Sequence, residues 1–325
     1  MEYRCLGRSG LRVSVLALGA ASFGRQCDVA TSMAIVERAL DLGVNFVDTA
    51  DVYGGGVSEE HVGRAIRGRR RDVVLATKLG NPTGEGPLWS GASRRYVLEA
   101  VQASLRRLRV DYLDLYQIHS WDPTTPIEET LRALDDLVRH GDVRYVGCSN
   151  FRAWQVVEAQ WVARTERLSP LVSIQVPYHL LDRSVETDLV PACQRHGVGL
   201  LPYFPLAGGF LSGRYRPGQA PPADTRLATA RLWGDPLAGQ VLTELNFAKL
   251  AALERFAQER GHSVRELALA WLAAQPQVSS VLAGATRPEQ VEENVRALDW
   301  RLSGDDLAQL DAALAAVVPA PPAEA

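Results

Sequence analysis

The stretch Val44-Asn45-Phe46-Val47-Asp48 decides the fold, because it is an apolar run that ends in a carboxylate. The same pattern recurs twice along the chain, at residues 73–78, which end in Lys78, and at residues 113–119, which end in His119. Amphipathic helical stretches lie between these runs. Short apolar runs that alternate with helices are typical of parallel strands in one sheet.

Four polar residues that can take part in proton chemistry follow these runs. They are Asp48, Tyr53, Lys78 and His119, called the tetrad below. In a closed (β/α)8 barrel, strand ends far apart in sequence meet on one face, where catalytic side chains are found. Each residue alone has an ordinary explanation, such as an exposed strand end or a structural histidine. Ordinary explanations for all four residues would require four independent coincidences on one face, so the pattern predicts a single site.

The chain has 325 residues, more than the roughly 250 that a (β/α)8 barrel needs. We predict one α/β domain, a (β/α)8 TIM barrel over residues 1–316, with an N-terminal β-hairpin at 3–15 and an extra C-terminal helix at 303–316. Residues 317–325 have too little apolar surface to bury, so we predict that they form a disordered tail. The predicted strands lie at 15–18, 45–49, 73–78, 113–119, 144–148, 172–175, 199–202 and 280–282. The predicted helices lie at 32–42, 58–67, 93–108, 127–140, 153–164, 188–196, 245–260, 264–274 and 289–298.

Composition and charge exclude several classes of function. Apolar residues make up 46% of the chain and charged residues 22%, as in ordinary globular proteins. The formal charge is only −3, which gives no support for a nucleic-acid partner. The four cysteines form no CxxC pair, the N-terminus has no apolar signal core, and no stretch is apolar over the length of a membrane span. We therefore predict a cytoplasmic protein with no metal, no membrane partner and no nucleic-acid partner.

Several motifs, in order along the chain, resemble those of the aldo-keto reductases, which are NADPH-dependent (β/α)8 enzymes. The similarity runs from about Tyr3 to Trp300. The matching segments are Leu6–Leu11, Asp48–Gly54, Gly147–Asn150, Gln175, Tyr203 with Pro205 and Leu206, and Gly284–Gln290 with Glu293 and Asn294. Each segment alone is weak, but together they are specific.

The resemblance implies that the tetrad reduces a carbonyl by hydride transfer from NADPH. The oxygen gains negative charge and needs an acid, and Tyr53 is the candidate. An ordinary tyrosine has a pKa near 10, and a neighbouring ammonium favours the phenolate, so Lys78 is expected to supply that charge. Asp48 is expected to hold the ammonium, and His119 to donate a hydrogen bond that orients the carbonyl.

A second group of residues is implied for the nicotinamide of the cofactor. No GxGxxG motif follows a strand, so a Rossmann site is not predicted. By resemblance, Ser149, Asn150 and Gln175 bind the carboxamide. Tyr203 stacks on the ring, and Pro205-Leu206 extends the match. Tyr203 and Gln175 could instead be ordinary core residues.

The segment after the eighth predicted strand fits the phosphates of the cofactor. Gly284, Thr286 and Arg287 lead into a helix whose N-terminus attracts phosphate. A planar guanidinium suits the adenosine 2′-phosphate that distinguishes NADPH from NADH. The residues expected to line the adenosine side are Gln290, Glu293 and Asn294. Arg287 could instead be a solvated charge at a helix end, so the sequence favours NADPH without excluding NADH.

Loops above the barrel are expected to select the substrate; they lie at 79–93, 120–126 and 204–245. Trp89 and Trp121, with Phe23, are the candidates for an aromatic pocket that accepts a small organic carbonyl. Phe210 and Trp233 could join that pocket or could staple a long loop to the barrel.

Three functions stay open at this stage. The first is an NADPH-dependent carbonyl reductase, and the second is an NADPH-binding regulatory subunit like the barrel subunits attached to potassium channels. The third is a dedicated keto-sugar or natural-product ketoreductase. The segment Gly208–Gly213 resembles the microbial branch that reduces aryl aldehydes, small ketones and keto-sugars, whereas Phe204 and Asp142 depart from the usual family residues. The sequence leaves the oligomeric state open, since no exposed apolar stripe can be identified on the predicted helices.

Overall fold

Eight strands form a single parallel sheet in the computed structural model, which describes residues 1–223, 225, 227–228 and 237–317. The strand order is β10-β3-β4-β5-β6-β7-β8-β9, so neighbours in sequence are neighbours in the sheet. The strands are β3 (Leu16–Gly19), β4 (Phe46–Asp48), β5 (Val74–Leu79), β6 (Leu113–Ile118), β7 (Val143–Ser149), β8 (Leu171–Pro177), β9 (Gly199–Tyr203) and β10 (Val281–Gly284).

The first and last strands of this order, β10 and β9, are connected by hydrogen bonds between β9 and the segment that precedes β10. The Leu200 amide donates to the Gln277 carbonyl at 3.0 Å, and the Ser279 amide donates to the Leu200 carbonyl at 2.9 Å. These bonds join β9 to the chain entering β10 and close the sheet on itself. The predicted (β/α)8 barrel is confirmed.

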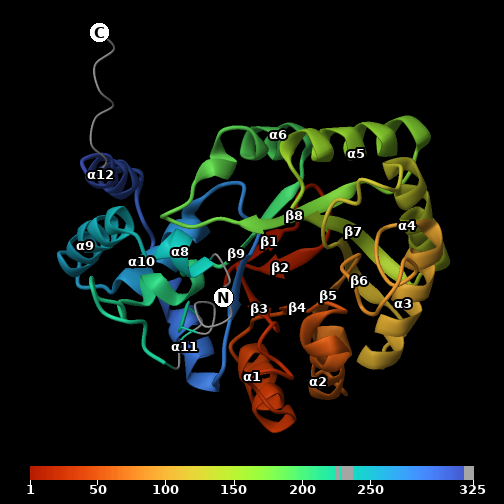
Figure 1. The fold of residues 1–325 in the computed structure, drawn as a ribbon, viewed down its shortest axis with the longest axis horizontal. Coiled ribbons are helices and arrows are strands. Elements are labelled where there is room, and N and C mark those ends of the chain that lie inside the picture. The colour runs from red at the N-terminus through yellow and green to blue at the C-terminus, as the bar shows by residue number, and fades with distance from the viewer. Residues whose placement is uncertain (224, 226, 229–236, 318–325) are drawn as a thin grey trace. The chain divides into compact units, whose positions relative to one another are not determined.

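Helices cover the outside of the strands, as Figure 1 shows for α1 to α6. Each follows a strand because a parallel neighbour can be reached only through a crossover. They are α1 (Val29–Asp41), α2 (Val57–Ala65), α3 (Arg94–Leu108), α4 (Ile127–His140), α5 (Ala153–Glu166) and α6 (Leu189–His196), with α11 (Pro288–Ala297) after β10. Short 3₁₀ helices that the sequence did not predict are η1 (Tyr53–Gly56), η2 (Arg70–Asp72) and η3 (Ser184–Glu186).

The predicted N-terminal hairpin is present as β1 (Tyr3–Cys5) paired antiparallel with β2 (Arg12–Ser14). Gly7, in the turn between them, has φ +54°, and a Cβ there would lie 2.3 Å from the Val172 carbonyl oxygen. Only glycine tolerates both the left-handed backbone and this approach. Leu6 and Val13 join the buried cluster that includes barrel residues such as Phe46. The hairpin therefore closes the amino-terminal end of the barrel.

The chain divides into two compact units. The first comprises residues 1–177, 184–203 and 276–295 and holds the whole eight-stranded sheet. The second comprises residues 178–183, 204–275 and 296–325; its described elements include η4 (Ala207–Ser212), α8 (Leu237–Val241), α9 (Glu244–Gln258), α10 (Val264–Ala274) and α12 (Gly304–Ala315). The extra C-terminal helix is thus present, and η4 and α8 lie in a region predicted as irregular loop. The single-domain assignment stays a prediction, and the predicted tail from 318 onward lies outside the described residues.

Within the described part of the chain, no helix is both long enough and apolar enough to cross a membrane.

Candidate active site

The tetrad comes together at the carboxyl ends of strands β4, β5 and β6. Lys78 is at its centre and is completely buried. Its ammonium nitrogen donates to Asp48 Oδ2 at 2.6 Å, to the Thr49 carbonyl at 2.8 Å and to the Tyr53 hydroxyl at 3.4 Å. Burial alone would lower the pKa of Lys78, but the negative charge of Asp48, followed by the interaction with Tyr53, outweighs burial and raises it. Lys78 is therefore a charged ammonium beside a tyrosine hydroxyl.

Asp48 links this ammonium to two buried amides. Its Oδ1 accepts hydrogen bonds from Gln117 Nε2 at 2.9 Å and from Gln175 Nε2 at 3.0 Å, while Oδ2 is used by Lys78. A buried carboxylate is tolerated only when it is paired and hydrogen-bonded, and both conditions are met here. Asp48 thus has one fixed orientation.

Tyr53 is carried by the turn that follows β4. The next three residues are glycines, Gly54, Gly55 and Gly56, with φ of +59°, +66° and +95°. This left-handed run is inexpensive only for glycine. At Gly56 an added Cβ would lie 2.8 Å from Arg107 Cδ, so Arg107 packs directly on the turn. The glycine run therefore lets the chain reverse immediately after Tyr53.

His119 follows β6 and lies edge-on to Tyr53, with ring centroids 5.9 Å apart. Burial, and then the charge of Lys78, lower the pKa of His119 to about 3. The imidazole is therefore neutral at ordinary pH and retains one N–H to donate. Its Nδ1 is buried and makes no hydrogen bond with any residue described by the structure.

A second buried polar cluster lies beside the tetrad. Glu59 on α2 is fully buried; it accepts a hydrogen bond from Thr77 Oγ1 at 2.6 Å and pairs with Arg107 Nε at 2.6 Å. Asp51 lies in the turn between β4 and η1, and its carboxyl group is buried. Neither of its oxygens has a hydrogen-bond partner among the described residues. Burial, and then the charge of Glu59, raise the pKa of Asp51 to about 7.

The residues predicted to bind the nicotinamide lie at neighbouring strand ends. Ser149 at the end of β7 donates to the Gln175 carbonyl at 2.9 Å. Asn150 adopts φ +59°, and its side-chain Nδ2 donates to the His119 backbone carbonyl at 3.0 Å. The Tyr203 hydroxyl donates to Asn150 Oδ1 at 2.8 Å. These side chains form one connected set with His119 and Asp48, and their contact with a cofactor stays a prediction.

Pro205 and Leu206 belong to the second unit, where they lead into η4. The neighbouring Phe204, one of the departures from the family pattern, has φ +55°, a backbone conformation that is uncommon outside glycine. The role of these residues at a cofactor also stays a prediction.

The predicted phosphate site is held together by its own side chains. The Thr286 amide donates to Gln290 Oε1 at 2.7 Å, and Arg287 contacts Glu293 at 3.2 Å and Glu289 at 3.8 Å. Arg287 is about half exposed, so a phosphate can reach it by displacing these carboxylates. Gly284 ends β10 and is exposed, whereas Asn294 is buried, and the contact of both residues with a cofactor stays a prediction.

The three candidate substrate residues lie in different surroundings. Trp121 is half-buried and packs edge-on against Phe151, with centroids 5.1 Å apart. Trp89 is exposed in the loop after β5. Phe23 is fully buried, so its side chain lies in the core of the protein as described.

The two aromatic residues of the long loop have separate outcomes. Phe210 is completely buried and packs on Tyr215 and Phe247 within the second unit, with centroids 5.6 and 5.0 Å away. Because these contacts lie within the second unit, both interpretations of Phe210, pocket residue and loop staple, stay predictions. Trp233 lies outside the described residues.

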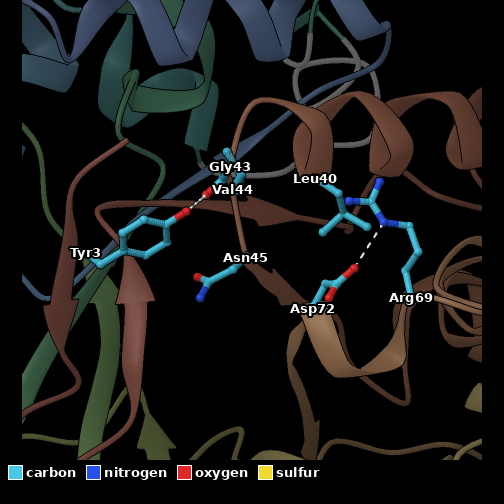
Figure 2. A pocket seen from close by; sticks show the side chains of 7 residues that line it. All are labelled: Tyr3, Leu40, Gly43, Val44, Asn45, Arg69 and Asp72. Atoms are coloured by element: carbon cyan, nitrogen blue, oxygen red, sulfur yellow. Dashed lines mark hydrogen bonds and ion pairs between the residues drawn. The ribbon is translucent and has the colours of Figure 1, made fainter.

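A cavity of about 350 Å³ lies near the amino ends of β4 and β5 (Figure 2). The tetrad lies at the opposite, carboxyl ends of the strands. The residues lining the cavity are Tyr3, Leu40, Gly43, Val44, Asn45, Arg69 and Asp72. Its charged groups already pair, since Arg69 contacts Asp72 at 3.3 Å and Asp41 at 2.9 Å. This cavity is separate from the candidate active site.

Sequence reasoning missed two residues of the site. Gln117 could have been found from the period of two along a strand, because it precedes His119 by two residues and so shares its inward face. Glu59 had no such signal, since an acidic residue in the first turn of a helix is usually solvent-exposed. Among the described residues, no group of three or more His, Cys, Asp or Glu side chains could hold a metal ion.

Comparison with known proteins identifies one family, but the similar proteins are named for different functions. A sequence model of the Aldo/keto reductase family matches residues 15–315. A probable voltage-gated potassium channel subunit beta of Oryza sativa subsp. japonica is 43% identical over 305 residues, covering 92% of each chain. The L-glyceraldehyde 3-phosphate reductase of Escherichia coli strain K12 is 38% identical over 320 residues, covering 96% of this chain and 92% of that protein.

Proposed function

The chain belongs to the aldo/keto reductase family, and on that premise we propose that it is an NADPH-dependent reductase of aldehyde or ketone carbonyls with Tyr53 as the general acid. The observation that carries the proposal is the buried Lys78 ammonium, which touches Asp48 on one side and the Tyr53 hydroxyl on the other. A fully desolvated lysine is costly unless its charge is paired and hydrogen-bonded, as that of Lys78 is with Asp48. Here that charge can stabilise a phenolate.

The donor set that follows β10 suits NADPH. A guanidinium, a threonine hydroxyl and the start of α11 gather at Thr286 and Arg287, and these groups recognise phosphate well. The half-buried Tyr203 supplies an aromatic face at the end of β9. When bound, NADPH would supply the hydride.

The chain's own residues would manage the proton. Tyr53 would donate its hydroxyl proton to the carbonyl oxygen as negative charge develops there. Lys78 would stabilise the phenolate that remains, and Asp48 would keep the ammonium aimed at it. The neutral His119 would donate its N–H to the same carbonyl oxygen and fix its direction.

A regulatory NADPH-binding role is a second candidate, because a protein 43% identical to the chain is named as a potassium channel subunit. A dedicated keto-sugar or related small-carbonyl reductase is a third, and the relative named as L-glyceraldehyde 3-phosphate reductase is consistent with it. The three differ in substrate turnover and can be separated by one assay.

The test is loss of NADPH absorbance with purified protein and a panel of aryl aldehydes, small ketones, keto-sugars and L-glyceraldehyde 3-phosphate. Turnover of any of them supports the reductase, and the best substrate chooses between the general and the dedicated enzyme. Tight NADPH binding without turnover would move the conclusion to the regulatory role. Absence of NADPH binding would overturn the proposal.

The cofactor preference has its own variant. Arg287→Ala should weaken NADPH binding by roughly tenfold or more, because a charged bidentate contact is lost. Binding of NADH, which lacks the 2′-phosphate, should change little. Equal losses for both cofactors would show that Arg287 does not read the 2′-phosphate.

A further inference from the structure

Asp51 is a buried carboxyl group to which the proposed mechanism gives no role. Asp51 is 3% exposed, and neither of its carboxyl oxygens has a hydrogen-bond partner among the described residues. An ionised carboxylate is stable in a protein interior only when it is paired and hydrogen-bonded. Buried polar groups that lack such partners are exceptional, and titratable groups in unusual surroundings gather at functional sites.

The charges around Asp51 are already paired with each other. Arg107 on α3 contacts Glu59 on α2 at 2.6 Å. Lys78 on β5 contacts Asp48 on β4 at 2.6 Å. Two cations therefore balance two anions, and an ionised Asp51 would be a third anion with no cation of its own. It would also be repelled by Glu59, which is fully buried.

Two tyrosines also interact with Asp51. Tyr116 on β6 is completely buried, and its hydroxyl has no hydrogen-bond partner in the described part of the chain. Tyr96 on α3 shares a hydrogen bond with the Thr83 hydroxyl at 3.0 Å. Burial is the largest cause that raises the pKa of both tyrosines, so both are neutral at ordinary pH. Neither tyrosine therefore brings a charge that could pair with Asp51.

Asp51 is thus most stable in its protonated form. Burial, and then the charge of Glu59, raise the pKa of Asp51 to about 7, whereas the charges of Arg107 and Lys78 oppose this shift. The direction agrees with the count of charges, which leaves no cation for an ionised Asp51. The group therefore changes from neutral to ionised within the ordinary range of pH.

The backbone connects Asp51 directly to the candidate acid. The Tyr53 amide donates to the Ala50 carbonyl at 3.1 Å and closes a four-residue turn. Asp51 and Val52 are the central residues of this turn. The Asp51 amide also donates to the Lys78 carbonyl at 3.4 Å. A shift of Asp51 therefore changes the turn that carries the Tyr53 side chain.

The contact that depends on this turn has little tolerance. Lys78 Nζ lies 3.4 Å from the Tyr53 hydroxyl, near the upper limit for a hydrogen bond. The glycines at positions 54–56 contribute no side chains that could hold the turn from the other side. Misplacement of a reacting group by about 1 Å can lower a rate by about a hundredfold.

Building on the proposed reductase function, we propose that Asp51 is a positioning residue for Tyr53. Its protonated carboxyl group keeps the turn packed in the buried cluster, and its ionisation, through repulsion by Glu59, displaces Tyr53 from Lys78. The fraction of molecules with Tyr53 in place then decreases as the pH rises. Turnover is therefore high at mildly acidic pH and falls as Asp51 loses its proton.

The first test follows the turn without any substrate. Hydrogen exchange of the amides at residues 50–57 is measured by mass spectrometry at pH 6 and pH 8.5 and corrected for the intrinsic exchange rates. In the opened turn the pKa of Asp51 returns to its ordinary 3.8 from about 7, so the opening equilibrium should rise about tenfold between these pH values. Asp51→Asn should abolish this rise.

Asp135→Asn is the matched control and should keep the rise. Asp135 on α4 is also a buried aspartate, but its oxygens accept hydrogen bonds from Ser169 and Arg139. Circular dichroism confirms that both variants are folded. Exchange at residues 50–57 that does not change with pH in the wild-type protein, or that changes equally in Asp51→Asn, would overturn the proposal.

The second test is the pH dependence of kcat with saturating NADPH and the best carbonyl substrate. The wild-type kcat should fall about tenfold or more from pH 6 to pH 8.5, with a smaller change in KM. Asp51→Asn should remove this fall, whereas Asp135→Asn should retain it. A fall that persists in Asp51→Asn, or an Asp51→Asn variant that is folded but inactive at pH 6, would contradict the positioning role. Absence of wild-type turnover at every pH would overturn the reductase function instead, and the exchange experiment would still decide whether Asp51 holds the turn.

Discussion

Replacing Asp48 by asparagine should damage the centre of the site in a way that its geometry makes specific. Asp48 Oδ1 accepts from the Gln117 and Gln175 amides, and Oδ2 accepts from Lys78. An asparagine can keep its oxygen toward the two glutamines, but its NH₂ group then faces the Lys78 ammonium at about the present 2.6 Å. In the flipped orientation its NH₂ group faces two other donors. Either orientation leaves a buried donor without an acceptor.

The magnitude follows from the burial of Lys78. Removing one partner of a buried ion pair costs about 3–5 kcal/mol. The Thr49 carbonyl still accepts a hydrogen bond from the ammonium. Asp48→Asn should therefore lower the free energy of unfolding at pH 7 by an amount near the lower end of this range, about 3 kcal/mol. Activity should fall as well, because the ammonium beside Tyr53 is no longer held or kept charged.

The pH dependence gives the sign of the effect. In the native protein the pKa of Lys78 is raised, so its favourable contribution is present below the ordinary pKa of 10.5 and is lost only as the pH rises above it. In Asp48→Asn, burial dominates and the pKa of Lys78 falls below 10.5. The variant therefore regains stability as the pH rises toward 10, where the unfolded chain also loses this proton. The difference in free energy of unfolding between the native protein and the variant should therefore become smaller from pH 7 to pH 10.

Urea unfolding at several pH values measures this gap, with Asp48→Asn/Lys78→Met as the matched control. The double variant has no buried charge left at this position and should recover at least about 1 kcal/mol relative to Asp48→Asn. A loss below about 1 kcal/mol that does not change with pH would refute the argument that Lys78 depends on Asp48 for its charge.

Three further perturbations test other parts of the structure. The pKa of Asp51 is raised from an ordinary 3.8 to about 7, so wild-type stability falls as the pH rises from 4 through 7. Asp51→Asn should remove this pH-dependent loss of stability, because asparagine carries no charge. That loss is on the order of 4 kcal/mol, and urea unfolding at pH 5 and pH 8 should show a flatter profile for the variant. Gly7→Ala should lower the free energy of unfolding by about 2 kcal/mol or more, and with it the melting temperature, since its Cβ would meet the Val172 carbonyl. Scanning calorimetry measures the melting temperature, and an unchanged value would contradict this expectation. Asp122→Asn should loosen the two loops that Asp122 joins through the Ala92 amide and the Thr124 hydroxyl, raising KM for carbonyl substrates while NADPH affinity, measured by fluorescence, stays the same.

The sequence predicts the barrel well because the period of each element is clear. Apolar runs such as those before Asp48 and Lys78 can be buried on both faces only in a parallel sheet, and the helices between them begin at recognisable caps such as Ser93. The predicted strand positions agree with the observed ones to within a few residues. Short 3₁₀ helices such as η1 were not predicted, since three consecutive glycines indicate flexibility rather than a particular turn.

The contacts of the site are harder to predict than its residues. That Lys78 lies between Asp48 and Tyr53 follows from the barrel, but the burial of Asp51 and Glu59 depends on how α2 and α3 pack, which a single sequence does not encode locally. The exposed Trp161 is a similar case: α5 is apolar around much of its circumference, and only the structure reveals which side faces solvent. Periodicity predicts which residues share a face, whereas packing decides which face is buried.

The most direct test of the account is Tyr53→Phe, assayed with the best carbonyl substrate beside Tyr112→Phe. Tyr112 is a matched tyrosine whose ring lies near the Arg70 and Arg144 guanidinium groups, 4.1 and 4.2 Å from its centroid, before strand β6. We expect Tyr53→Phe to lower kcat by about 10²–10⁴-fold with NADPH affinity unchanged, and Tyr112→Phe to retain normal turnover. Full activity of Tyr53→Phe would contradict the assignment of Tyr53 as the acid and, with it, the proposed mechanism.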